Sequence, residues 1–158
     1  MKKNIIYFSN HLTISKGHGI SRYSNSLLSN LIYLNDHFKI IPVTASNRLN
    51  KSELLKLKNT IGLKILKTGR FLTPTLWWVF KKPSIENLLN LKEISLVHTL
   101  SLGYPIITKK PLVVTIHDIG PLIEPNFFTR KDKFLMKKSF KQCVDRANKI
   151  ICVSEATA

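Results

Sequence analysis

Short apolar runs alternate along this chain with longer segments in which apolar residues recur every three or four positions. The clearest run, Leu112–Ile116, follows Pro111 and ends at the polar pair His117 and Asp118. Such a run is typical of a strand that is buried on both faces of a parallel sheet. We therefore expect His117 and Asp118 to lie where this strand leaves the sheet.

The remaining apolar runs predict further strands at 5–8, 38–43, 63–66, 95–98 and 149–153. Helical periodicity predicts a helix over 20–34 with Ser21 as its N-cap, and a long basic helix over 130–146. The apolar stripe of the basic helix consists of Phe134, Phe140, Val144 and Ala147. Segment 47–58 is interpreted as a basic surface segment, and 84–91 as a further helix or the continuation of a helix over 71–80.

Strands that alternate with helices at this spacing favour βαβ units. The expected fold is α/β: a Rossmann-like, doubly wound parallel sheet of about six strands with helices on both faces. In such a sheet the first and fourth strands flank the switch point, and ligands bind beyond the carboxyl ends of the strands. One cleft is therefore predicted from loop 17–19, the residues after His98, and the pair His117 and Asp118. The glycine amides that lead into the first helix are also a candidate anion site.

Segment 71–80 is aromatic and contains Trp77 and Trp78, with lysines and arginines on both sides. One interpretation is a helix packed on the core with a solvated basic rim. The other is a membrane-facing element, because interfacial helices place Trp and Phe beside Lys and Arg at the level of the lipid headgroups.

The charge balance is strongly basic. The 158 residues include 25 Lys and Arg against 9 Asp and Glu, a formal net charge of +16. A field of this sign favours partners that carry phosphates or anionic lipid surfaces. The length suits one domain, and no run approaches the roughly 20 apolar residues that cross a bilayer. Cys143 and Cys152 lie within apolar patterns, so we expect two buried hydrophobes in a reducing compartment.

Three common site motifs do not fit the sequence. A dinucleotide fingerprint needs its first glycine directly after the strand, whereas Gly17 comes nine positions after Phe8 and Arg22 holds the third glycine position. No P-loop pattern is present. The histidines outside the 112–118 segment have no spacing typical of metal ligands, so neither NAD, nucleoside-triphosphate hydrolysis nor a metal site is expected.

Three motifs follow one another along the chain: Gly19-Ile20-Ser21-Arg22-Tyr23 before a leucine-rich helix, Val114-Thr115-Ile116-His117-Asp118-Ile119 with Pro121-Leu122, and Ala147-Asn148-Lys149-Ile150-Ile151-Cys152-Val153-Ser154-Glu155-Ala156-Thr157. Together, and in this order, they resemble the amino-terminal domain of glycosyltransferase family 4. This is the GT-B group that includes bacterial mannosyl- and other hexosyltransferases. The resemblance spans nearly the whole chain.

The resemblance implies retaining transfer of a hexose, with mannose as one candidate, from a nucleotide-sugar to a glycan or lipid-linked acceptor in cell-surface polysaccharide synthesis, such as that of lipopolysaccharide. It implies no cofactor, because the nucleotide-sugar is a substrate. It also implies no obligatory metal. It also implies a cytoplasmic protein, peripheral at the inner face of the cell membrane.

In the family, the amino-terminal domain mainly holds the acceptor and the carboxy-terminal domain mainly holds the donor. Residues 1–158 correspond to the first of these domains, and the two glutamates of the donor-side motif are absent. We therefore expect the chain to be incomplete, to reach a nucleotide-sugar through a second domain, and to have little transfer activity alone.

The resemblance assigns roles to individual residues. His117 and Asp118 are the catalytic candidates, and His117 is expected to contact the transferred sugar near its reacting carbon. The substrate-binding candidates are Gly17, His18, Gly19, Arg22 and Tyr23 at the first helix, and Ser154 and Glu155 at the expected edge of the cleft.

Alternative roles stay open for several of these residues. His117 is either a ligand contact or a strand-end histidine bonded to the backbone, and Asp118 either contacts substrate or caps its own turn. Arg22 binds an acceptor phosphate or pairs with a nearby carboxylate. The basic helix 130–146 is a solvated face or a lipid surface.

The function also has an alternative, which is a non-catalytic, anion-binding or accessory module that docks a separate catalytic subunit. Nucleic acid is not the expected partner, because the aromatic residues fit core stripes and not an exposed stacking platform.

Overall fold

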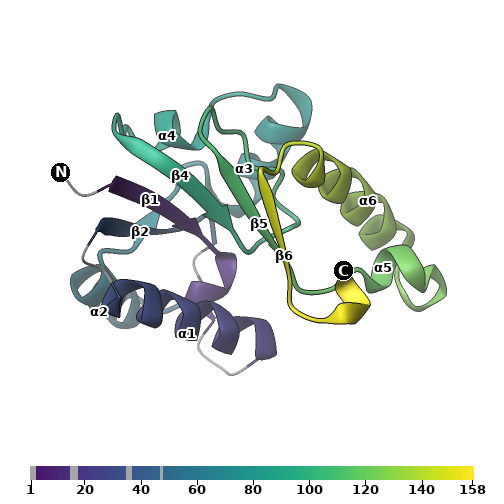
Figure 1. Cartoon of the computed structure of the whole chain (residues 1–158), viewed down its shortest axis with the longest axis horizontal. Coiled ribbons are helices and arrows are strands. Elements are labelled where there is room, and N and C mark those ends of the chain that lie inside the picture. The colour runs from purple at the N-terminus through teal and green to yellow at the C-terminus, as the bar shows by residue number, and fades with distance from the viewer. Residues whose placement is uncertain (1–2, 15–17, 35–36, 47) are drawn as a thin grey trace.

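The computed structural model describes residues 3–14, 18–34, 37–46 and 48–158. At its centre is a six-stranded, all-parallel sheet with the order β3-β2-β1-β4-β5-β6 (Figure 1). The strands are β1 (Lys3–Phe8), β2 (Phe38–Thr44), β3 (Lys64–Ile65), β4 (Ile94–Thr99), β5 (Leu112–Ile116) and β6 (Lys149–Cys152). The order reverses between β1 and β4, so the predicted doubly wound α/β architecture is confirmed.

Helices cover both faces of the sheet (Figure 1). One face carries α1 (Gly19–Tyr33) and α2 (Lys51–Ile61), and the other carries α3 (Gly69–Val79), α4 (Ile85–Leu88) and α6 (Arg130–Val144). The short α5 (Gly120–Ile123) precedes α6, and three 3-10 turns complete the described elements: η1 (Asn10–Thr13), η2 (Pro125–Phe127) and η3 (Glu155–Thr157).

The alternation of side chains along β1 divides the core into two layers. Ile6 and Phe8 pack toward Trp77 of α3, whereas Tyr7 packs toward Leu28 of α1. All five of these side chains are almost fully buried. Because successive residues of a strand point to opposite faces, a central strand with helices on both sides must be apolar at nearly every position.

Helix α1 begins two residues before the predicted N-cap, so the prediction for Ser21 is wrong. The extended backbone of His18 starts the helix, and no side chain caps it there. Ser21 lies inside the first turn, buried, and its hydroxyl donates to the carbonyl oxygen of His11 at 3.1 Å. Its hydroxyl therefore ties α1 to η1.

Segment 47–58 contains most of a regular helix, α2, which the sequence analysis did not predict. Asn50 and Glu53 form a capping box at its start, and Gly62 ends it with a left-handed φ of 68°. This Asn-x-x-Glu spacing and the glycine after the last turn were the available signals. In the predicted helix 84–91, only the single turn of α4 is helical.

The apolar stripe predicted for the basic helix is correct for three of its four residues. Phe140, Val144 and Ala147 pack against the core, whereas Phe134 is 64% exposed. Segment 71–80 forms α3 and packs on the core through the buried Trp77, as one of its two interpretations predicted. Cys143 is buried and Cys152 is half-buried, and both are free thiols.

No helix in the described part of the chain combines the length and the apolar character that crossing a membrane requires.

The hydroxyl of Tyr7 joins the sheet to α1, because it donates to the carbonyl oxygen of Ser24 at 2.8 Å in the core. We predict that Tyr7→Phe lowers the free energy of unfolding by about 1 kcal/mol in urea titrations, since a buried hydrogen bond is lost. The control is Tyr33→Phe, at an 87% exposed position at the end of α1. Equal effects of the two substitutions would contradict the prediction.

Candidate functional site

A cleft of about 460 Å³ lies at the carboxyl ends of β1, β2, β4 and β5. It combines residues that are far apart in sequence: Asn10, His11 and Ile14; Ile20 of α1; Ser46 and Arg48 after β2; Arg70 and Phe71 of α3; Leu100, Ser101, Leu102, Gly103 and Tyr104 after β4; His117 and Asp118 after β5; and Met136 of α6. The structure thus places the residues after β4 and β5 around one cavity, at the edge of the sheet where a doubly wound fold binds ligands.

Asn10 fixes the floor of the cleft, because its side chain joins the ends of two strands. Its Oδ1 accepts hydrogen bonds from the backbone N–H groups of Ala45 and Ser46, at 2.8 and 3.1 Å. Its backbone N–H donates to Ser101 Oγ at 2.9 Å. Since the oxygen is held by these donors, the amide orientation is set, and Nδ2 is left as a buried donor with no partner among the described residues.

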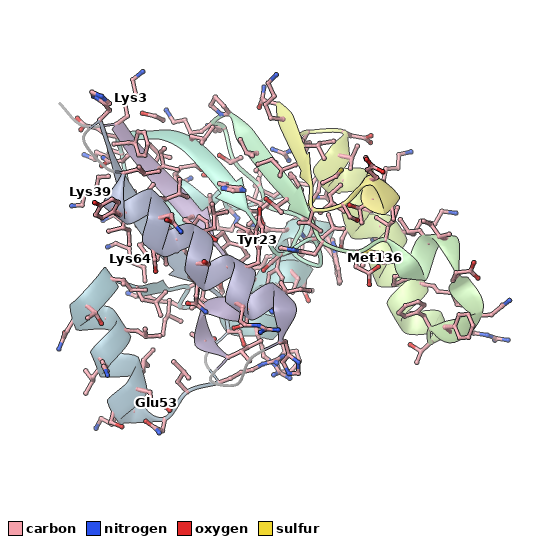
Figure 2. All side chains as sticks on the ribbon, turned by 60° about the horizontal axis from the view of Figure 1, so that its bottom comes forward. Lys3, Tyr23, Lys39, Glu53, Lys64 and Met136 are labelled. Carbon is pink, nitrogen blue, oxygen red and sulfur yellow. The ribbon has the colours of Figure 1, made fainter. Side chains whose placement is uncertain are left out.

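His117 packs against α1. Its ring meets the ring of Tyr23 edge-on, with 4.9 Å between the centroids. Its Nε2 is buried and has no hydrogen-bond partner within the described ranges. The first helix therefore approaches the imidazole through Tyr23, which Figure 2 labels, whereas Gly19 of the predicted loop does not line the cleft.

Two more buried polar atoms on the wall of the cleft lack a partner among the described residues: His11 Nδ1 and Ser46 Oγ. The backbone of His11 is held in η1, where its N–H donates to Ser9 Oγ and its carbonyl accepts from Ser21 Oγ. Together with Asn10 and His117, four residues of the cleft lining thus each hold a buried polar atom that is unpaired within the described residues. Buried polar groups are normally paired, so this concentration indicates a surface built to bind a polar molecule.

Burial keeps the histidines of this region neutral. Desolvation is the largest cause that lowers the pKa of His11 and of His117, and for His11 the nearby His117, Arg48 and His18 lower it further. Beneath the cleft, burial and then His117 lower the pKa of His98 to about 4. A neutral imidazole has one donor and one acceptor nitrogen, so His11 and His117 can each bind a hydroxyl group.

The rim of the cleft carries the formal charges. Arg48 and Arg70 are exposed cations, and the Arg70 guanidinium lies 4.4 Å from the centroid of the Phe71 ring. The carboxylate of Asp118 accepts from the N–H of Gly120 at 2.6 Å, so this residue caps its own turn while it lines the cleft. Two arginines, one after β2 and one in the first turn of α3, suit an anionic group on a ligand.

The other predicted site residues lie at or outside the edge of this cavity. Gly17 lies outside the described residues. His18, Gly19 and Arg22 are exposed at the start of α1 and do not line the cleft, although Ile20 between them does. Ser154 and Glu155 are exposed beyond β6; Ser154 forms a capping box with Thr157 and does not reach the cavity.

Several residues of the cleft are not among those predicted from the sequence: Asn10, His11, Ser46, Arg48 and Arg70. Asn10 and His11 directly follow β1, so the rule that ligands bind beyond strand ends could have singled them out. For Arg48 and Arg70 no local signal exists, because the place of Arg48 depends on the path of the segment after β2 and that of Arg70 on the packing of α3. In the described ranges, no group of three or more His, Cys, Asp or Glu side chains is placed to hold a metal ion.

Comparisons of this chain with protein-family models, with curated proteins and with solved structures gave no match. The family resemblance therefore rests on the three sequence motifs, and the function is argued below from the cleft itself.

His98 makes the stability of the fold depend on pH. Its Nε2 lies 2.8 Å from Thr115 Oγ1, and its pKa falls from 6.5 to about 4 on folding. Between these values the unfolded chain binds a proton that the folded protein does not. We predict that the free energy of unfolding is fully retained above about pH 6.5 and decreases toward pH 4, by on the order of 3 kcal/mol from this residue.

Urea titrations across this pH range test the prediction. His98→Gln should flatten the decrease, whereas His37→Gln, at an exposed position, should leave it as in the parent protein. The same pH dependence in His98→Gln as in the parent would show that another group causes it.

Proposed function

We propose that the cleft binds the sugar and acceptor side of a glycosyl transfer reaction. The reaction is the retaining transfer of a hexose from a nucleotide-sugar to a glycan or lipid-linked acceptor. The observation that carries the proposal is the polar lining of this cleft, in which four residues each hold a buried polar atom unpaired within the described ranges: Asn10 Nδ2, His11 Nδ1, Ser46 Oγ and His117 Nε2.

Carbohydrates match this set because each hydroxyl both donates and accepts. The amide nitrogen of Asn10 only donates, each neutral imidazole offers one donor and one acceptor, and the Ser46 hydroxyl does both. A ligand with one kind of group, such as a carboxylate alone, would satisfy only the donors. Several adjacent hydroxyls on a rigid ring offer both donors and acceptors to side chains of this kind.

The rest of the lining also suits a sugar. The cavity of about 460 Å³ is in the range of small-molecule sites, and the rings of Phe71 and Tyr104 provide apolar surface for the C–H faces of a pyranose. The hydroxyl of Tyr104 donates to the carbonyl of Arg70 at 2.9 Å, which fixes this ring against α3. Fixed walls lower the entropy lost when a ligand binds.

In this proposal, His117 orients the transferred sugar near its reacting carbon. The neighbouring Tyr23 ring holds the imidazole in place, and burial keeps it neutral at physiological pH. A neutral imidazole donates to, or accepts from, a sugar hydroxyl without a charged group that would repel an oxocarbenium-like transition state. Asp118 acts mainly by shaping the turn that presents His117.

The rim arginines extend the proposal to phosphate. Arg48 follows β2 and Arg70 lies in α3. Both are exposed and line the rim of the cavity. Either guanidinium can bind the phosphate of a nucleotide-sugar or of a lipid-linked acceptor in a bidentate manner. In the family that the motifs resemble, the donor is held mainly by a second domain, so binding of the sugar and acceptor is the direct property of this chain to measure.

We predict that the chain binds hexoses or short oligosaccharides in saturation-transfer NMR, and that His117→Ala weakens this binding by about tenfold, the size expected for one lost hydrogen bond with its ring contact. The matched control is His37→Ala, which removes an imidazole that does not line the cleft. Circular dichroism confirms that each variant is folded.

Two results would contradict the proposal. One is the absence of binding to any member of a broad hexose and oligosaccharide panel. The other is binding that His117→Ala and His37→Ala change equally, since the ligand would then lie elsewhere. A parallel assay with labelled nucleotide-sugars should show little transfer by the chain alone.

A further inference from the structure

The aromatic segment and the basic helix, which are far apart in sequence, lie against one another in the fold. The indole N–H of Trp78 in α3 donates to Ser139 Oγ in α6 at 3.2 Å. The side-chain amide of Gln142 in α6 donates to the carbonyl of Trp77 at 3.3 Å. The outward sides of α3 and α6 therefore form one continuous surface.

The α3 part of this surface is apolar. Phe71, Leu72 and Val79 are 73%, 52% and 62% exposed, and Phe80, which follows the helix, is 63% exposed. Positions 71, 72 and 79 lie on one side of the helix, because residues seven or eight apart recur after two turns. The opposite side buries Thr73 and Trp77. An exposed apolar stripe of this kind marks an interaction surface.

The α6 part is basic and hollowed. A groove of about 590 Å³ is lined by Lys81, Phe134, Lys137, Lys138, Lys141, Gln142, Asp145 and Arg146. Among these described lining residues, five have a positively charged side chain and one, Asp145, has a carboxylate. The exposed Phe134, which the sequence analysis had placed in the core, lies among them with its ring centroid 5.8 Å from Lys138 Nζ.

We propose that this surface docks the protein on an anionic phospholipid bilayer. We call it the α3–α6 face, and it consists of Phe71, Leu72, Val79, Phe80, Lys81, Phe134, Lys137, Lys138, Lys141 and Arg146. The aromatic and aliphatic side chains enter the headgroup region, and the lysines and arginine bind lipid phosphates around them.

The composition of the face favours a bilayer over other anionic partners. The cations select a negatively charged surface, but Leu72, Val79 and Phe80 need an apolar environment that a nucleic-acid backbone does not offer. Lysines beside exposed aromatic residues are typical of helices that lie at the membrane interface, where the long side chains reach the headgroups while their stems contact apolar groups.

The face also adjoins the cleft. Phe71 belongs to both, and Met136, which directly precedes Lys137 of the basic groove and is labelled in Figure 2, lines the cleft as well. If the proposed function holds, a lipid-linked acceptor would reach His117 from the membrane side; this orientation rests on the proposed function, whereas docking on the bilayer does not.

Co-sedimentation with phospholipid vesicles tests the docking surface without any sugar. The full chain is mixed with vesicles of phosphatidylcholine alone or of phosphatidylcholine with phosphatidylglycerol. We expect binding only to the anionic vesicles. Reversal of three charges on the face, in Lys137→Glu, Lys138→Glu and Lys141→Glu combined, should weaken it by tenfold or more, roughly as expected from the contribution of each basic residue near the surface.

The matched control has the same net charge. Lys51→Glu, Lys56→Glu and Lys58→Glu combined change three exposed lysines of α2, on the other face of the sheet. This variant should lose much less binding than the α6 variant. Equal losses would overturn the proposal, since the net charge and not the α3–α6 face would then bind the vesicles.

A second pair of variants tests the apolar part. Phe80→Ser with Phe134→Ser should weaken binding to the anionic vesicles severalfold, whereas Tyr33→Ser, at an exposed aromatic position of α1, should leave it unchanged. No difference between these variants would overturn the insertion of the aromatic residues. Binding to duplex DNA that is tighter than binding to the anionic vesicles, and that the α6 variant abolishes, would also overturn the proposal and make nucleic acid the partner.

Discussion

The position of β1 between β2 and β4 is the constraint on which the rest of this structure depends. The chain connects to β2 on one side and resumes on the other side with β4, so the loops after these strands diverge and leave the cleft between them. The ladder continues past the strand ends, where the N–H of Ser9 donates to Val43 and that of Leu100 donates to Phe8. Asn10 then closes the cleft floor by bonding to the end of β2.

The cleft keeps polar groups buried without partners, at a cost to stability. Each such group loses its hydration on folding, and a bound molecule that reaches it returns a hydrogen bond. The same burial prevents His11, His98 and His117 from carrying charge near neutral pH. The site is thus polar and uncharged inside and cationic at its rim, a distribution suited to a hydroxyl-rich ligand that carries a phosphate.

Helix α3 connects the two surfaces for which we propose roles. Its first turn brings Arg70 and Phe71 to the cleft, and its last turn leads through Val79 and Phe80 to the basic groove on α6. The buried Trp77 anchors the middle of the helix in the core. A helix that runs from the basic groove to the cleft would fix the direction in which the cleft opens relative to a bilayer bound at the groove.

The sequence by itself determined the α/β class, the approximate positions of the six strands and the place of His117 at a strand end, because apolar periodicity reports burial directly. It did not determine the cap of α1 or the exposure of Phe134. One apolar residue at the edge of a helical stripe is compatible with either the core or the surface. Only the tertiary structure decided that His11, Ser46, Arg48 and His117 share a cleft and that α3 lies against α6. Such proximity depends on the paths of loops and the packing of helices across a sheet, and neither leaves a periodic signal in the chain.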